Sequence, residues 1–193
     1  MGPQIIAWKE KIKELPERKA EFEKWLFINL AGVLAGSKSG ELLVLRRKNG
    51  LEIDEQIKCI GDLAPIWSYS YLVLLKDKDC SRVIIYKNNK VQRALSLLPK
   101  WVLDKLGYSH DLSPEDFLKE VSRRWYSNNR IPHEIAFALG YPIKDVLGYM
   151  GLISLPSTGI CGWRIHGDPE PSILKSREFK RAKKEALEFL MDC

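Results

Sequence analysis

The sequence has few cysteines, and no two of them stand close together. The four are Cys59, Cys80, Cys161 and Cys193, and they include no C-x-x-C pair. Their spacing excludes a zinc ribbon and a thioredoxin-type redox motif, because both depend on closely spaced cysteines. We therefore expect reduced thiols and a cytosolic protein.

Long apolar runs are also missing. No hydrophobic stretch approaches the roughly 18 residues that a membrane span requires. Residues 1–19 distribute charges among their apolar positions and form no continuous hydrophobic region. An ordinary signal peptide is therefore not expected. These features predict a cytoplasmic protein without a membrane span.

The motifs that identify common enzyme classes are absent as well. There is no Gly-rich phosphate loop, no G-x-S-x-G elbow and no dinucleotide-binding fingerprint. Their absence argues against the common nucleotide-binding and hydrolase classes. His133-Glu134 begins like the metalloprotease motif H-E-x-x-H, but position 137 is Phe, so the second ligand is missing. We predict no metal site, and the cofactor, if there is one, is unknown.

The residues that are present describe an ordinary folded domain. Of the 193 residues, 45% are hydrophobic and 29% are charged, which is typical of a globular protein with a single core. We expect one domain over residues 1–193, with a helix in residues 1–15 at its periphery. The formal net charge is +6, and six basic residues accompany one acid between Lys175 and Lys184. That segment is either the solvated face of a helix or a phosphate-binding surface.

Hydrophobic periodicity predicts helices in most of the chain. Apolar residues recur at helical spacing, and prolines stand where several helices are expected to begin. The expected helices cover residues 3–15, 16–34, 52–63, 89–98, 99–106, 113–126, two short segments opened by Pro132 and Pro142, and a last helix after Asp168-Pro169. Residues 127–130, SNNR, are the expected exposed hinge.

Strands are expected in three places. The segments near 69–76 and 82–87 are aromatic and β-branched runs separated by the polar DKDC, which is a hairpin pattern. Residues 41–46, ELLVLR, form another expected strand, followed by a turn at Asn49-Gly50, and 160–167, ICGWRIHG, form the last. Because strands and helices do not alternate regularly, we predict the α+β class, with a small sheet that carries a β-hairpin and is covered by several helices.

The candidate functional segment is residues 131–170. It contains polar and aromatic residues that the fold alone does not require: His133, Glu134, Tyr141, Arg164 and His166. They gather in two segments near loops, where ligand-binding residues are common. We hypothesise that the chain is a binding or accessory domain that recognises a small molecule or a protein partner through these five residues. Under a purely structural interpretation, Glu134 interacts with a helix N-terminus and His133 packs or caps.

DNA binding is a second hypothesis. Residues 132–150 have the small residue, turn glycine and later apolar position of a helix-turn-helix, at Ala136, Gly140 and Val146. The second helix offers a groove only three polar side chains, Lys144, Asp145 and Tyr149. A helix that reads base edges usually presents Arg, Asn, Gln or Lys, so nucleic acid is not the first choice of partner.

An enzyme is the third hypothesis. His133 and Glu134 would act as an acid–base pair, with Tyr141 assisting, and the positive end of a helix would favour the glutamate charge. Catalysis is not the leading expectation, since no nucleophile or cofactor motif accompanies the pair.

The same residues carry a resemblance to a family. His133-Glu134-Ile135, Leu139-Gly140-Tyr141-Pro142, Asp145-Val146 with Gly148, Cys161-Gly162-Trp163 and Gly167-Asp168 resemble an uncharacterised bacterial family known as domain of unknown function 3793. Residues 29–43 look like its N-terminal segment, and the likeness runs from about Phe22 onward. The resemblance implies a cytosolic bacterial protein with no established activity. The family pattern often has a His-Cys pair where this chain has Asn29-Leu30, so any metal or redox chemistry of that pair is missing here.

Overall fold

An antiparallel three-stranded sheet lies at the centre of the computed structural model, which describes residues 2–47 and 51–191. Its strands are β1 (Gly40–Arg46), β2 (Ser70–Lys76) and β3 (Cys80–Tyr86), in the spatial order β1-β3-β2. β2 and β3 form the predicted hairpin, with a bulge between Val73 and Leu75. The turn predicted at Asn49-Gly50 lies outside the described residues.

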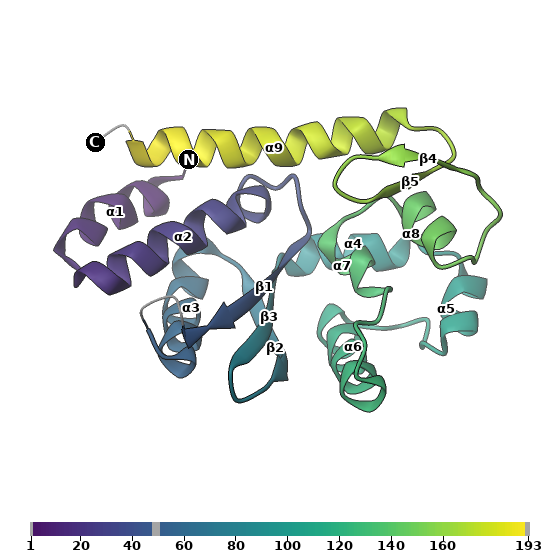
Figure 1. The fold of residues 1–193 in the computed structure, drawn as a ribbon, viewed down its shortest axis with the longest axis horizontal. Helices are drawn as coiled ribbons and strands as arrows, with labels where there is room; N and C mark the ends of the chain where they lie inside the picture. The colour runs from purple at the N-terminus through teal and green to yellow at the C-terminus, as the bar shows by residue number, and fades with distance from the viewer. Residues whose placement is uncertain (1, 48–50, 192–193) are drawn as a thin grey trace.

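Helices cover both faces of this sheet (Figure 1). One face is covered by α1 (Pro3–Lys11), the short 3-10 helix η1 (Ile12–Glu14), α2 (Glu17–Leu34), α3 (Ile53–Trp67) and α9 (Glu170–Met191). The other is covered by α4 (Asn88–Ser96), α5 (Lys100–Leu106), α6 (Pro114–Asn128), α7 (Ile135–Leu139) and α8 (Ile143–Tyr149). The predicted α+β class and single domain are confirmed. Within the described part of the chain, no helix is long and apolar enough to cross a bilayer.

The central strand β3 supplies side chains to both faces. Val83 and Ile85 belong to the cluster with α1, α2, α3 and α9, whereas Ile84 and Tyr86 belong to the cluster with α4 to α8. Because successive side chains of a strand point to opposite faces, a continuous apolar run is what a sheet covered on both sides requires. The sheet therefore separates two hydrophobic cores, where a single core was expected from the composition.

The first core contains a group of aromatic residues around Trp8. The Trp8 ring stacks on Phe27 and meets Trp67 edge-on, each with ring centroids 4.9 Å apart. Its indole N–H donates to the buried Glu23 carboxylate at 2.7 Å. Burial and the Glu23 charge raise the pKa of the neighbouring Cys59 thiol to about 12, so this thiol stays protonated. The N-terminal helix, expected at the periphery, thus contributes Trp8 to the core.

Several boundaries differ from the sequence expectation; α6, for example, extends to Asn128, into the segment 127–130 that was expected to be a hinge. α3 continues to Trp67 through Pro65, because a proline in the last turn removes only one helical hydrogen bond while Trp67 gains a buried position. The prediction of a single strand at 160–167 is wrong. That segment turns at Gly162, where φ is 108°, and separates β4 (Ser157–Ile160) from β5 (Arg164–His166), which pair as a second, two-stranded sheet.

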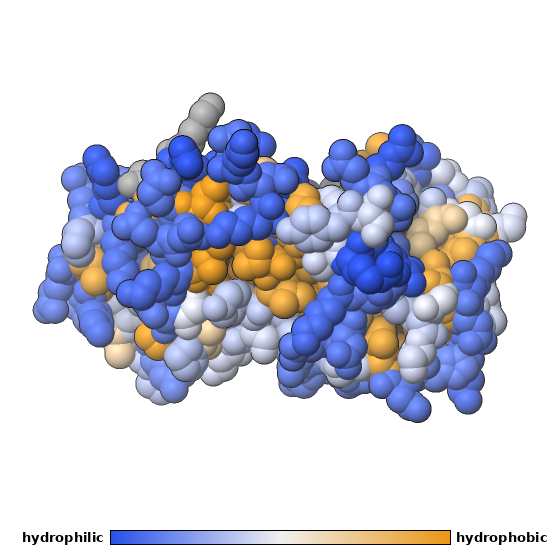
Figure 2. Space-filling view, turned by 90° about the horizontal axis from the view of Figure 1, so that it is seen from below, coloured by the Kyte–Doolittle hydropathy of each residue, from blue (hydrophilic) through white to orange (hydrophobic). Residues whose placement is uncertain are grey.

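α9 runs along the length of the molecule, from the β4–β5 hairpin to α1 and α2 (Figure 1). Its buried Ala182 and Ala186 belong to the first core, and its first turns pack near the hairpin. The surface opposite α9 is mostly hydrophilic, with apolar residues gathered in a hollow between the two halves of the molecule (Figure 2). α9 therefore connects the half of the molecule that contains α1 and α2 with the half that contains the β4–β5 hairpin.

Candidate functional site

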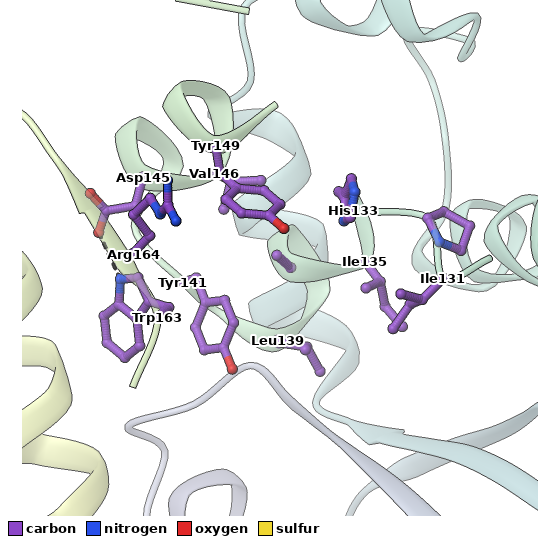
Figure 3. A pocket seen from close by; sticks show the side chains of 12 residues that line it. Ile131, His133, Ile135, Leu139, Tyr141, Asp145, Val146, Tyr149, Trp163 and Arg164 are labelled. Carbon is purple, nitrogen blue, oxygen red and sulfur yellow. Dashed lines mark hydrogen bonds between the residues drawn. The ribbon is translucent and has the colours of Figure 1, made fainter. Parts of the chain in front are cut away.

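An apolar pocket lies where the α6–α7 connection, α7, α8 and β5 meet (Figure 3). Its volume is about 370 Å³, which is within the range of small-molecule sites. Nine of its twelve lining residues are aliphatic or aromatic: Ile131, Pro132, Ile135, Ala136, Leu139, Tyr141, Val146, Tyr149 and Trp163. The other three are His133, Asp145 and Arg164.

Proline and glycine shape the corner between α7 and α8. The carbonyl of Pro132 accepts the N–H of Ile135 at 3.2 Å, so Pro132 lies in the turn before α7 and not inside the helix. Gly140 ends α7 with φ of 83°, and a Cβ there would lie 2.9 Å from the backbone nitrogen of Ser39. Only glycine tolerates both conditions. Pro142 then precedes α8, as the sequence predicts.

Tyr141 and Trp163 form one wall of the pocket. Their rings stack with centroids 4.8 Å apart and an interplanar angle of 19°. Phe179 of α9 packs against both rings. Burial and the charge of Glu41 raise the pKa of the Tyr141 phenol, which therefore stays protonated near neutral pH. This wall is a rigid aromatic surface with a neutral hydroxyl.

Asp145 holds that wall in place. Its carboxylate is 2% exposed and accepts four hydrogen bonds, all between 2.6 and 2.9 Å. The donors are the backbone N–H of His166, the Lys144 ammonium, the Ser172 hydroxyl and the Trp163 indole. Burial disfavours the charged form of Asp145, but the four donors outweigh it and lower its pKa. The carboxylate joins α8, β5 and α9, and its bonding capacity is used within the protein.

Arg164 and His133 lie on opposite sides of the pocket (Figure 3). Arg164 is exposed on β5, and among the described residues its guanidinium forms no ion pair. The His133 ring meets the Tyr149 ring edge-on, with centroids 5.0 Å apart. Of the five residues predicted for the site, the pocket brings together His133, Tyr141 and Arg164.

Glu134, the fourth predicted residue, lies outside the lining of this pocket. Its buried carboxylate accepts hydrogen bonds from Arg124 at 2.9 Å and from the Tyr108 hydroxyl at 3.2 Å. Arg124 also binds Glu120 at 2.7 Å. The partners of Glu134 are thus on α6 and in the α5–α6 connection. A carboxylate held by an arginine is a poor general base, so the geometry gives no support to an acid–base pair with His133.

His166, the fifth, is buried behind the pocket. Its backbone N–H donates to Asp145, its carbonyl accepts from Lys144 at 2.8 Å, and its Nδ1 lies 3.1 Å from the Leu155 carbonyl. A Cβ at Gly148 would lie 2.5 Å from the His166 ring, so α8 approaches this ring closely only because residue 148 is glycine. His166 thus supports β5 and does not line the pocket.

Trp163 and Tyr149 line the pocket but were not among the predicted site residues. Trp163 is next to Arg164 in the sequence, so a search for aromatic neighbours of the selected residues would have found it. Tyr149 is brought to His133 only by the α7–α8 corner. No local sequence signal distinguishes it from an exposed surface tyrosine.

The helix-turn-helix segment has its polar side chains turned inward. α8 packs against β5, and Asp145 is buried there. Lys144 donates to Asp145, to the His166 carbonyl and to Ser172. Of the three side chains expected to face a DNA groove, only Tyr149 is largely exposed, at 54%. The geometry therefore adds nothing in favour of base reading by this helix.

The described part of the chain contains no cluster of three or more His, Cys, Asp or Glu arranged to hold a metal ion. In α2, Leu30 is fully buried and the Asn29 amide donates to the Trp25 carbonyl at 2.7 Å. Both residues serve the packing of α2.

Comparison with known proteins gives one result. A family model described as "Protein of unknown function (DUF3793)" matches residues 26–193, in agreement with the resemblance seen in the sequence. No curated protein and no solved structure matches the chain.

Proposed function

Because the chain belongs to the DUF3793 family, whose function is unknown, we propose a function from the pocket itself: the protein binds a small, largely apolar molecule between α7, α8 and β5. We further propose that it does so in the bacterial cytosol, as a binding or accessory protein. The cytosolic placement is supported by the widely spaced cysteines, which suit a reducing compartment.

The observation that carries the proposal is the lining of the pocket. Nine of twelve residues present carbon surface to a volume of about 370 Å³, and the few polar groups stand at different points around it. Removing apolar surface from water stabilises a complex by about 25 cal/mol per Å². A few polar groups then fix the orientation of the ligand, which is the usual composition of a small-molecule site.

The walls are also held in place independently of any ligand. Asp145 fixes Trp163 through the indole N–H, and Trp163 stacks on Tyr141. Pro142 restricts the backbone between Tyr141 and α8. Because these side chains are already ordered, binding loses little conformational entropy, and this favours affinity.

Binding is a better supported proposal than catalysis. The lining carboxylate Asp145 and the predicted acid–base residue Glu134 are both engaged by cations of the protein. His133 remains as the ionisable imidazole on the lining, but its ring packs against Tyr149. A lone imidazole without an orienting partner is a weak basis for acid–base chemistry.

Fluorescence titration with N-phenyl-1-naphthylamine, a neutral aromatic probe, tests this proposal. The wild-type protein should bind it saturably at one site. Ala136→Phe places a ring in the pocket and should weaken binding at least about tenfold. Ala94→Phe makes the same change on α4, outside this pocket, and should bind like wild type. Circular dichroism checks the folding of each variant. No saturable binding by wild type, or equal binding by Ala136→Phe, would overturn the proposal.

A further inference from the structure

We propose that the ligand of this pocket is a planar apolar acid, whose carboxylate or sulfonate group is bound by Arg164. This inference rests on the proposed function, since it concerns the same pocket, and it adds the chemical class of the ligand. It follows from the charges on the pocket lining and from the position of Arg164 beside the aromatic wall.

The pocket has an uncompensated positive charge. Asp145 and Arg164 carry opposite charges on the lining, but they do not form an ion pair with each other. Asp145 is neutralised by the Lys144 ammonium at 2.7 Å, and three uncharged donors occupy its remaining hydrogen-bonding capacity. Arg164 has no carboxylate partner within the described ranges. An anionic ligand would supply the partner that the protein does not.

Arg164 is close to the surface on which a flat ligand would lie. β5 places it directly after Trp163, and Figure 3 shows both on the same side of the pocket as Tyr141, opposite Ile131 and Ile135. A ring that packs along Tyr141 and Trp163 therefore brings its substituent near the guanidinium. The planar fork of an arginine binds carboxylate or sulfonate oxygens through two parallel hydrogen bonds.

The opposite side of the pocket favours the apolar end of such a ligand. Ile131, Ile135 and Leu139 present only carbon there, and the one imidazole on that side, His133, packs its ring against Tyr149. A charged group placed against them would lose its hydration without gaining a partner, which is unfavourable. The distribution of lining residues thus predicts one orientation, with the anionic group at β5 and the apolar body toward α7.

Two fluorescent probes of nearly the same shape test this inference. 8-Anilinonaphthalene-1-sulfonate adds one sulfonate to the neutral N-phenyl-1-naphthylamine. We expect wild type to bind the sulfonate about tenfold more tightly than the neutral probe. Arg164→Gln should remove this preference, so that the ratio of the two affinities falls to about one. Arg164→Lys should retain part of it, because a lysine keeps the charge but not the fork.

Arg130→Gln is the matched control. Arg130 is exposed in the hollow on the other side of residues 131–133. Replacing it with glutamine changes the net charge by the same amount as Arg164→Gln. It should leave the preference for the sulfonate intact. The inference is overturned if Arg164→Gln affects both probes alike or neither, or if Arg130→Gln has the same effect. In those outcomes the neutral probe still saturates and the proposed function stands; if neither probe saturates on wild type, both proposals fail.

Discussion

At the scale of single residues, the chemistry of the site depends on how Asp145 is satisfied. A buried carboxylate is stable as an ion only when enough donors replace its hydration. Asp145 has four, from α8, β5, α9 and the β4–β5 turn, and the donor in that turn is the Trp163 indole that forms the pocket wall. Asp145 therefore contributes both to the shape of the pocket and to the stability of the fold.

Asp145→Asn should lower the free energy of unfolding by about 2–4 kcal/mol at pH 7. The new amide nitrogen would face a group that now donates a hydrogen bond to the carboxylate oxygen, so two donors would oppose each other. Lys144 would also lose its counter-charge. Urea unfolding measures this loss. Asp111→Asn changes an exposed aspartate and should stay within about 0.5 kcal/mol of wild type.

The stability difference between wild type and Asp145→Asn should depend on pH, because the pKa of Asp145 is lowered in the folded protein. A carboxyl whose pKa is depressed in the folded state stabilises the protein fully above its unfolded pKa. Its ordinary value is 3.8, so the stabilisation is lost only as pH falls below this value and through the lower folded pKa. The stability difference between wild type and Asp145→Asn should thus be constant from pH 7 to about pH 5 and shrink in more acid solution. A difference that already disappears near pH 6 would contradict this assignment.

Sequence reasoning reached three of the pocket residues for a physical reason. His133, Tyr141 and Arg164 are polar or aromatic residues near turns, and turns lie at the surface where sites form. Glu134 and His166 have the same local appearance. Their burial depends on partners distant in sequence, Arg124 for the first and Lys144 for the second, so no local pattern could exclude them.

At the scale of elements, α8 and β5 pack unusually closely. Gly148 of α8 faces the buried ring of His166, whose backbone N–H donates to Asp145 and whose Nδ1 lies 3.1 Å from the Leu155 carbonyl. The arrangement positions Arg164, which precedes His166 on β5, and Trp163, which stands just before that strand. Any separation of α8 from β5 would therefore move the charged group and the aromatic wall of the pocket together.

Gly148→Ala should destabilise the protein by about 1–3 kcal/mol, although alanine favours helix by about 1 kcal/mol. The new Cβ would lie 2.5 Å from His166 Cγ, and the ring cannot move freely. Thermal unfolding measures the effect. In Gly159→Ala the nearest atom to the new Cβ is 3.7 Å away, and this variant should unfold within a few degrees of wild type. An unchanged or raised melting temperature for Gly148→Ala would show that α8 and β5 are not in this contact.

Elements with strong local signals could be predicted from the sequence, and the others could not. α6 has its Ser113 cap, with the hydroxyl accepting the Asp116 N–H at 3.1 Å, and the β2–β3 hairpin has two apolar runs around a polar turn. β4 is four residues long and mostly exposed, so its alternation is too short to recognise. It exists because β5 pairs with it, which is a non-local cause.

At the scale of the whole molecule, the pocket lies at the edge of the core formed by α4 to α8. Ile135, Leu139 and Val146 belong both to that core and to the pocket lining. The α+β class could be predicted from composition and periodicity. The division into two cores could not, because it depends on which helices pack on which face of β3. The pocket follows from that division, since it forms where the second core meets the β4–β5 hairpin.

The most direct test of the proposed binding site is to map it in solution. Backbone amide NMR shifts of the wild-type protein would be recorded during titration with N-phenyl-1-naphthylamine. The account predicts saturable shift changes concentrated in residues 131–149 and 163–164, with α1, α2 and α3 largely unaffected. Shift changes that are confined to other segments, or that never saturate, would contradict it.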